Sequence, residues 1–345
     1  MRPVLFEVFG VEIPSYYTLM AIGFGLALYL GWRESKRVGV NADDFLDLGL
    51  YMLLAGLIGS RILHVFADGY FWDYVHLCTD PLQVEVPQFI HVKCATDAEC
   101  LTQGAGALCH PDTGRCHPAR DCFAAFAFWQ GGLAFIGGLL LCIPIGTWFI
   151  RRRQMSWPQV ADITAFGVPI GLAFGRIGCF LSGCCYGAIT PGPAGVRFAG
   201  YLTATGPDAT CPPNYQRIDL EAGGQACAFG RPAFLDHAEH GHLAYGADLS
   251  LPVHPTQLYE SLLAFALFAW IYLYRRTHRR YAGQAFFEFC ALYPIGRFTI
   301  EFFRADERGL WLGELVSTSQ LLGIPLCAWA IWRLWANRHR RDEVA

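Results

Sequence analysis

Seven apolar runs, each long enough to cross a lipid bilayer, dominate the sequence. About 20 helical residues span the hydrocarbon of a membrane. The runs are approximately Ile13–Trp32, Phe45–Phe66, Phe123–Ile150, Val160–Leu181, Gln257–Tyr274, Ala285–Phe303 and Leu315–Trp335. Only 16% of the residues are charged, whereas a soluble domain carries about 25%. The sequence therefore predicts an all-α membrane protein, with about seven transmembrane helices in one domain over residues 1–345.

Four clusters of basic residues follow the first, third, fifth and seventh runs. The clusters are Arg33, Lys36 and Arg37; Arg151, Arg152 and Arg153; Arg275, Arg276, Arg279 and Arg280; and Arg333, Arg338, Arg340 and Arg341. With seven spans all four clusters fall on one side of the membrane, and an excess of Lys and Arg is typical of the cytoplasmic side. We therefore expect the N-terminus outside and the C-terminus in the cytoplasm. The net charge of −3 gives no indication of a nucleic acid partner.

Two polar loops carry groups of cysteines. The first loop, over residues 67–122, contains Cys78, Cys94, Cys100, Cys109, Cys116 and Cys122. The second, a Gly- and Pro-rich loop over residues 182–252, contains Cys211 and Cys227. Clustered, even-numbered cysteines in polar loops are typical of disulfides in an oxidising compartment. We expect a Cys-rich extramembrane insertion with three disulfides of unknown pairing, and a small periplasmic cap, both on the outer side.

Several ionisable residues fall inside or at the ends of the apolar runs, where charge is costly and usually functional. Arg297, Glu301 and Arg304 are spaced four and three apart, so they share one helical face. The charges could simply neutralise one another. However, Arg61, Arg176, Arg297 and Arg304 outnumber Glu260 and Glu301. Arginine matches phosphate with its planar fork of donors, so the surplus favours a polar cavity that binds or transforms a phospholipid.

Eight short motifs along the chain have the order and spacing of one known family. They are Ser15-Tyr16-Tyr17-Thr18-Leu19-Met20, Gly59-Ser60-Arg61, Trp129 to Leu139, Gly175 to Gly187, His254 to Glu260, Tyr293-Pro294-Ile295-Gly296-Arg297, Glu301-Phe302-Phe303-Arg304 and Ser319-Gln320. On these motifs the chain resembles the prolipoprotein diacylglyceryl transferases over most of its length. The insert from Cys78 to Cys122 has no counterpart in the family pattern.

The resemblance implies transfer of a diacylglyceryl group from phosphatidylglycerol to the lipobox cysteine thiol of a prolipoprotein, with release of glycerol phosphate. Its partners would be phosphatidylglycerol, the lipobox peptide and membrane lipid, without a cofactor or a metal. The location implied is the bacterial inner membrane, with a cavity that faces the periplasm. We expect catalytic roles for Arg176, Arg297, Glu301 and Tyr293, and substrate-binding roles for Tyr17, Arg61, Gly187, His254, Tyr259, Glu260 and Arg304.

The motif around Arg176 departs from the family pattern Gly-Arg-x-Gly-Asn-Phe-x-Asn-Gly-Glu. Cys179 and Ser182 replace the two asparagines, and Cys184 replaces the glutamate. Ile136 stands where the family has a histidine that could act as the base for a thiol. The candidate substitutes for that base are Glu260, Glu301, Tyr259 and His254.

Three cysteines, Cys179, Cys184 and Cys185, lie within this altered motif. We expect a structural disulfide among them, or from one of them to Cys211 or Cys227. Redox or acyl-carrier chemistry ranks second. A metal site ranks last, because the spacing matches no standard zinc pattern.

Two other functions remain open on the sequence. A membrane thiol oxidoreductase would use Cys179, Cys184 and Cys185, but no Cys-x-x-Cys motif accompanies them, and the arginines would have no task. A non-catalytic lipid-binding paralogue would account for Ile136 in place of the histidine, with the Cys-rich loop as an interaction surface.

Overall fold

The computed structural model describes residues 4–8, 11–67, 69–84, 94–102, 106–127, 135–204, 211, 216–220, 225–305, 310–311 and 316–341. Seven long α-helices lie in this part of the chain, at the positions of the predicted apolar runs. They are α1 (Ser15–Arg37), α2 (Ala42–Ala67), α5 (Phe135–Arg152), α6 (Trp157–Ser182), α8 (Thr256–Ala269, continued by a π-helical turn over Trp270–Arg275), α9 (Gln284–Glu301) and α10 (Thr318–Ala336). Three described helices, over Ala42–Phe66, Trp157–Ser182 and Thr256–Arg275, are long and apolar enough to cross a membrane.

The predicted start of the third run at Phe123 was wrong. Ala124–Phe126 forms a short 3-10 turn outside α5. Arg61 of α2 donates hydrogen bonds to two carbonyl oxygens of this segment, at 2.6 and 2.8 Å, so the turn is tied to the side of another helix. The Trp129–Ala134 part of the third-run motif lies outside the described residues.

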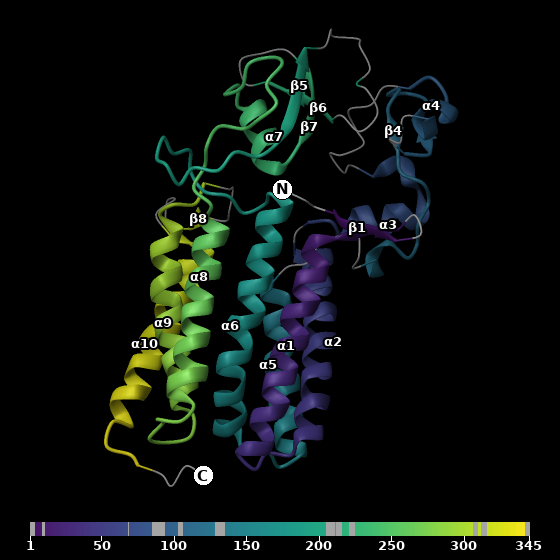
Figure 1. Ribbon diagram of the computed structural model, residues 1–345. Helices are drawn as coiled ribbons and strands as arrows, with labels where there is room; N and C mark the ends of the chain where they lie inside the picture. Colours follow the sequence, from purple (N-terminus) through teal and green to yellow (C-terminus); the bar gives the residue numbers. More distant parts are fainter. Residues whose placement is uncertain are drawn as a thin grey trace.

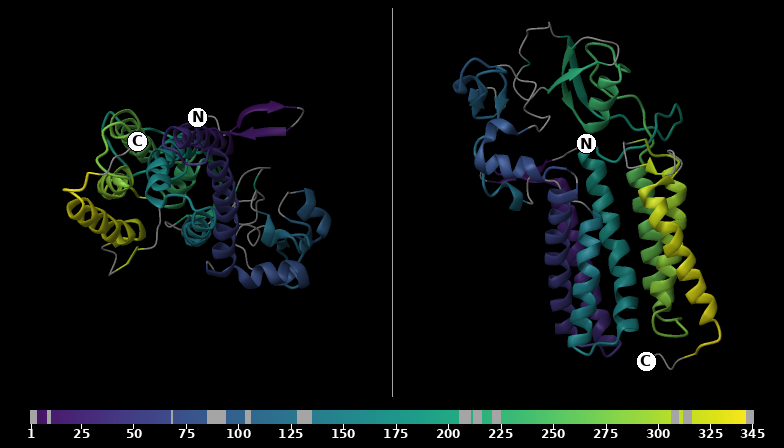
Figure 2. Two further views of the ribbon diagram at one scale, coloured as in Figure 1. Left: turned by 90° about the horizontal axis from the view of Figure 1, so that it is seen from below. Right: turned by 180° about the vertical axis from the view of Figure 1, so that it is seen from behind.

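The long helices stand side by side as two packed groups that meet at α6 (Figures 1 and 2). Helix α6 packs against α1 on one side, and against α8 and α9 on the other. Helix α2 packs against α5, and α10 packs against α9. Because α6 touches both groups, polar side chains on its last turns can meet residues of α8 and α9.

Glycines allow the close approach of α2 and α5. A Cβ atom added to Gly59 would lie 2.7 Å from the Cβ atom of Leu141, and nearer still to the carbonyl oxygen of Gly137. A Cβ atom on Gly138 would lie 3.0 Å from the carbonyl oxygen of Gly56. The two backbones are therefore in contact where these glycines face each other.

The four basic clusters lie at one end of the bundle, as predicted (Figure 1). They meet acidic residues there: Arg276 lies 3.5 Å from Glu34, and Arg153 lies 3.3 Å from Asp44. The opposite end of the bundle carries the two polar loops.

The second polar loop contains a small antiparallel sheet in the strand order β5-β7-β6, with one helix packed against it. Its elements are β5 (Gly200–Ala204), β6 (Gln216–Asp219), β7 (Gln225–Gly230) and α7 (Pro232–Glu239). Leu202, Ala228 and Phe234 are buried between the sheet and the helix. Two-stranded hairpins β1 (Val4–Val8) with β2 (Val11–Pro14), and β8 (Leu310–Trp311) with β9 (Val316–Ser317), precede α1 and α10.

The Cys-rich loop holds short elements and three disulfides, so the predicted number is confirmed. The elements are α3 (Phe71–Thr79), a 3-10 turn over Pro81–Gln83, α4 (Asp97–Thr102), β3 (Leu108–Cys109) and β4 (Cys116–His117). The disulfides are Cys78–Cys122, Cys94–Cys109 and Cys100–Cys116. Among the described residues of the segment, one buried cluster is formed by Cys100 and Cys116 with Cys94 and Cys109 packed against them.

The contact between α2 and α5 can be tested with a matched pair of glycine substitutions. Gly59→Ala should lower the free energy of unfolding by about 1–3 kcal/mol, because the added methyl group overpacks the helix contact. Gly25→Ala on α1 is the control, since a Cβ atom there meets nothing within 4 Å. Thermal unfolding of the purified protein in detergent measures both. Equal midpoints for the two variants would contradict the close contact.

Candidate functional site

The carboxylate of Glu260 is the centre of a buried charge cluster. Glu260 lies on α8 and is fully buried. Arg176 Nη2 lies 3.1 Å from Oε1, Arg297 Nε lies 3.7 Å from Oε1, and Arg304 Nη1 lies 3.7 Å from Oε2. The Tyr293 hydroxyl donates a hydrogen bond of 2.8 Å to Oε1. One carboxylate thus draws together side chains from α6, from α9 and from the segment that follows α9.

The helical spacing of α9 places two charged residues of the cluster on one face of the helix. Arg297 and Glu301 are one turn apart and form an ion pair. The hydroxyl groups of Ser317 and Ser319, at the start of α10, face the Glu301 carboxylate. Ser317 also caps α10 by accepting from the Gln320 backbone N–H. The Ser319-Gln320 motif of the sequence therefore helps to hold Glu301 in place.

The arginines of the cluster differ in their exposure to solvent. Three guanidinium groups, of Arg176, Arg297 and Arg304, face the carboxylates of Glu260 and Glu301. The side chain of Arg176 is 19% exposed, whereas those of Arg297 and Arg304 are 8% and 2% exposed. Arg176 is therefore the arginine that an incoming anion can reach most readily.

His254, Tyr259 and Gly187 lie together beside this cluster. His254 Nδ1 and the Tyr259 hydroxyl are 3.2 Å apart, and both rings pack against Phe303. The Gly187 backbone N–H donates to the His254 carbonyl oxygen at 2.9 Å, and Gly187 pairs with Arg304 through a β-bridge. A Cβ atom on Gly187 would lie 2.7 Å from the Cβ atom of His254. The glycine thus lets the His254 and Arg304 segments approach each other.

Two of the predicted site residues make other contacts. Arg61 donates to carbonyl oxygens of the Ala124–Phe126 region, and its guanidinium lies 5.1 Å from the centre of the Tyr74 ring. Tyr17 is 40% exposed, and its ring contacts that of Tyr16. Tyr16, which was not among the predicted site residues, lies close enough to Arg176 and the neighbouring cysteines to interact with them electrostatically. The helical spacing of α1 could have indicated Tyr16 only if the face of α1 that points into the bundle were known.

Cys179, Cys184 and Cys185 are free thiols, so the predicted disulfide at these positions was wrong. Cys211 pairs with Cys227 instead. The three sulfur atoms lie within 4.8 Å of one another. Side chains at the start of α8 hold their backbone, because Gln257 Nε2 donates to the Cys184 carbonyl oxygen at 2.6 Å and Thr256 Oγ1 donates to that of Cys185 at 2.9 Å.

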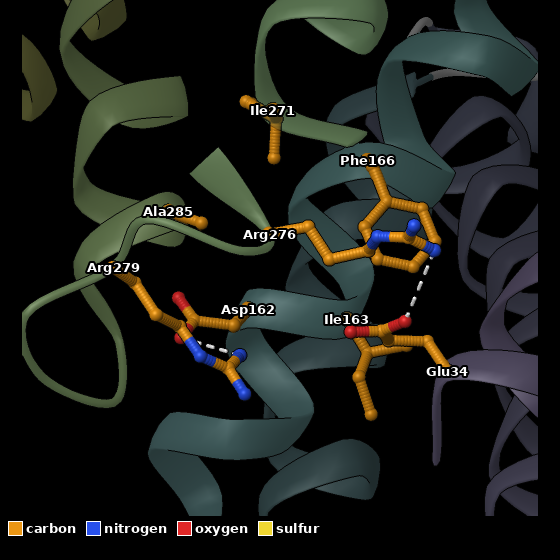
Figure 3. A pocket seen from close by; sticks show the side chains of 8 residues that line it. All are labelled: Glu34, Asp162, Ile163, Phe166, Ile271, Arg276, Arg279 and Ala285. Atoms are coloured by element: carbon orange, nitrogen blue, oxygen red, sulfur yellow. Dashed lines mark hydrogen bonds and ion pairs between the residues drawn. The ribbon is translucent and has the colours of Figure 1, made fainter. Parts of the chain in front are cut away.

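A second group of charged side chains lines a small pocket at the opposite end of the bundle (Figure 3). Arg276 lies 3.5 Å from Glu34, and Arg279 lies 3.4 Å from Asp162. Asp162 also accepts hydrogen bonds of 2.8 and 3.1 Å from two backbone N–H groups at the start of α9. Each of these two arginines is paired with one carboxylate, so its charge is compensated within the protein. The group links α1, α6 and α9.

Comparison with known proteins gives one consistent family. The sequence model of the family described as Prolipoprotein diacylglyceryl transferase matches residues 3–88 and 116–336. The stretch left unmatched contains Cys94, Cys100 and Cys109 of the Cys-rich loop. Relatives named Phosphatidylglycerol--prolipoprotein diacylglyceryl transferase include one from Xylella fastidiosa (strain M12), 27% identical over 97% of this chain and 92% of the relative. Another, from Clostridioides difficile (strain 630), is 26% identical over 100% of this chain and 99% of the relative.

The central role of Glu260 predicts a large loss of stability on removal of its charge. Glu260→Gln should lower the free energy of unfolding by about 3–5 kcal/mol, because buried arginines lose their common partner. Asp47→Asn is the control: Asp47 is 50% exposed beside Arg153, and a surface pair contributes at most about 1 kcal/mol. Thermal unfolding in detergent compares them. A Glu260→Gln protein as stable as the control would show that the carboxylate does not hold the cluster.

Proposed function

The chain belongs to the prolipoprotein diacylglyceryl transferase family, and we propose that it transfers the diacylglyceryl group of phosphatidylglycerol to the lipobox cysteine thiol of a prolipoprotein. The observation that carries the proposal is the convergence of Arg176, Arg297 and Arg304 on the buried carboxylate of Glu260. Clustered arginines suit the phosphate of a phospholipid, because guanidinium donors match phosphate oxygens.

The reaction breaks the bond between the diacylglyceryl carbon and a phosphate oxygen, and forms a thioether bond from that carbon to the acceptor sulfur. The released glycerol phosphate gains one negative charge as a phosphodiester becomes a phosphomonoester. Arg176 and Arg297 would bind the phosphate and stabilise this growing charge more strongly than the charge of the bound substrate, which accelerates the reaction. Glu260 and Tyr293 would hold the two arginines in orientation.

The proton of the acceptor thiol needs a base, because the thiolate is the nucleophile. Ile136 on α5 cannot take a proton. Glu260 and Glu301 are each engaged by arginine, whereas His254 contacts the neutral hydroxyl of Tyr259. An imidazole changes charge near neutral pH. We assign the role of base to His254, oriented by Tyr259, and Gly187 brings its segment next to Arg304.

The arrangement in the membrane follows from the same charges. The seven long helices would be the spans of a single domain over residues 1–345 in the bacterial inner membrane, with the N-terminus outside and the C-terminus in the cytoplasm. The Cys-rich insertion (67–122) and the small cap (182–252) would then lie in the periplasm, next to the arginine cluster. The presence of disulfides in both loops supports this side. The alternative function, a thiol oxidoreductase, would give the buried arginines no role in the reaction.

Substitution of Arg176 separates a phosphate-binding role from a structural one. Arg176→Lys should lower turnover by about 10²–10³-fold, as loss of one transition-state donor does, since lysine keeps the charge but lacks the fork. Arg176→Gln should lower turnover further. The abundance of the protein should stay normal, because Glu260 keeps Arg297, Arg304 and Tyr293 as partners. The assay follows labelled phosphatidylglycerol onto a lipobox peptide.

Arg276→Lys is the matched control, because Arg276 is a half-buried arginine paired with Glu34 at the other end of the bundle. Its turnover per folded molecule should equal that of the unmodified protein. Full turnover in Arg176→Gln would exclude the phosphate role. Reduced abundance with unchanged turnover per molecule would assign Arg176 to folding alone.

The proposed orientation predicts the location of both ends. A fluorescent protein fused after residue 341 should fluoresce, and alkaline phosphatase fused there should be inactive, because the four basic clusters stay in the cytoplasm. A small epitope before β1 should be accessible to antibody in spheroplasts with intact inner membranes. An active phosphatase fusion at the C-terminus would reverse the orientation.

A further inference from the structure

The three free thiols at the end of α6 form a site that the transferase reaction does not use. We propose that Cys179, Cys184 and Cys185 bind one thiophilic metal ion, Zn²⁺ or Cu⁺, as thiolate ligands. Their sulfur atoms lie within 4.8 Å of one another, and Cys179 is buried. Three sulfurs at about 2.3 Å from one Zn²⁺ ion would be about 3.8–4.0 Å apart. A shift of less than about 1 Å for any pair of sulfurs therefore completes the site.

The end of α6 explains why residues five apart in sequence meet. Gly183 follows the helix in the left-handed conformation, with φ of 81°. The Gly183 N–H donates to the Phe180 carbonyl oxygen at 3.2 Å, and the Cys184 N–H donates to that of Cys179 at 3.1 Å. This pair of bonds is the Schellman motif, in which the side chains at the positions of Cys179 and Cys184 touch. The usual apolar contact of the motif is here a contact of two thiols.

An uncommon backbone conformation brings the thiol of Cys185 close to the other two. Cys185 has φ of 61°, which few residues other than glycine adopt. Hydrogen bonds from Thr256 and Gln257 hold the carbonyl groups of Cys185 and Cys184 against the start of α8. The position of Gly183 is also closed to larger residues, because a Cβ atom there would lie 2.9 Å from the Cβ atom of Arg231. The three ligands are thus held by a rigid frame, as a metal site requires.

The ligand type suits a soft metal ion. Soft thiolates select Zn²⁺ and Cu⁺ over hard cations such as Mg²⁺. Close sulfur atoms are not enough for a metal site. Cys94, Cys100 and Cys109 are equally close, but all three are in disulfides and cannot act as thiolate ligands. The cluster at α6 keeps its thiols free.

The full-length protein offers a matched set of cysteines for the test. Its other three free thiols, Cys142, Cys290 and Cys327, lie on α5, α9 and α10. In detergent, the variant with all three replaced by Ala should bind one Co²⁺ ion with the absorption bands of tetrahedral thiolate coordination, and Zn²⁺ should displace it. Competition with a chromogenic Cu⁺ chelator measures the Cu⁺ affinity and shows which ion binds more tightly. The bound ion should also protect the remaining thiols from alkylation.

Replacing one ligand gives the decisive comparison. Cys185→Ser in this background should lower the metal affinity at least about 100-fold, because loss of a direct ligand exceeds the 10–100-fold effect of an outer-shell residue. Thermal unfolding without metal checks that the variant folds, and Cys179→Ser serves if it does not. Failure of both Zn²⁺ and Cu⁺ to protect the thiols, equal affinity in the Ser variants, or a disulfide among these cysteines in thiol-blocked membranes would overturn the proposal. None of these readouts depends on transferase activity.

Discussion

The buried carboxylate of Glu260 is the interaction on which the interior of this protein depends. Charge inside a membrane protein is costly unless it is paired. Glu260 meets Arg176, Arg297 and Arg304 and accepts a hydrogen bond from Tyr293, so it connects α6, α8, α9 and the segment after α9. Glu301 adds a second carboxylate through its ion pair with Arg297. These contacts hold the helices together and gather the three guanidinium groups that we propose bind an anion.

The two ends of the bundle hold two different groups of charged side chains. At the basic end, Arg276 faces Glu34 and Arg279 faces Asp162. Asp162 also accepts from backbone N–H groups at the start of α9, where a helix carries partial positive charge. Each arginine is paired with a carboxylate, so these contacts stabilise the junction of α1, α6 and α9. The Glu260 cluster instead gathers three arginines on one carboxylate, and the proposed chemistry lies there.

The substitutions around Arg176 change the chemistry of the side chains at the end of α6. The left-handed Gly183, its Schellman bonds and the support from Thr256 and Gln257 form the end of α6. Cys179 and Cys184 stand at positions where the family has asparagine and glutamate. Oxygen and amide groups are thereby exchanged for thiols on a backbone that brings them together. The proposed site for a soft metal ion thus lies next to the proposed phosphate site.

Residue pattern alone predicted the long helices, the shared end of the basic clusters, the number of disulfides in the Cys-rich loop and most members of the arginine cluster. These properties follow from local composition and spacing: apolar run length, positive charge beside the runs, even cysteine counts, and the shared face of Arg297, Glu301 and Arg304. Three other features emerged from the folded chain. Arg61 binds the Ala124–Phe126 region, and Tyr16 interacts electrostatically with Arg176. Cys179, Cys184 and Cys185 stay free while Cys211 pairs with Cys227. Each of these outcomes depends on which helix faces meet and on the distances between segments far apart in the chain, and a single sequence contains no measure of either.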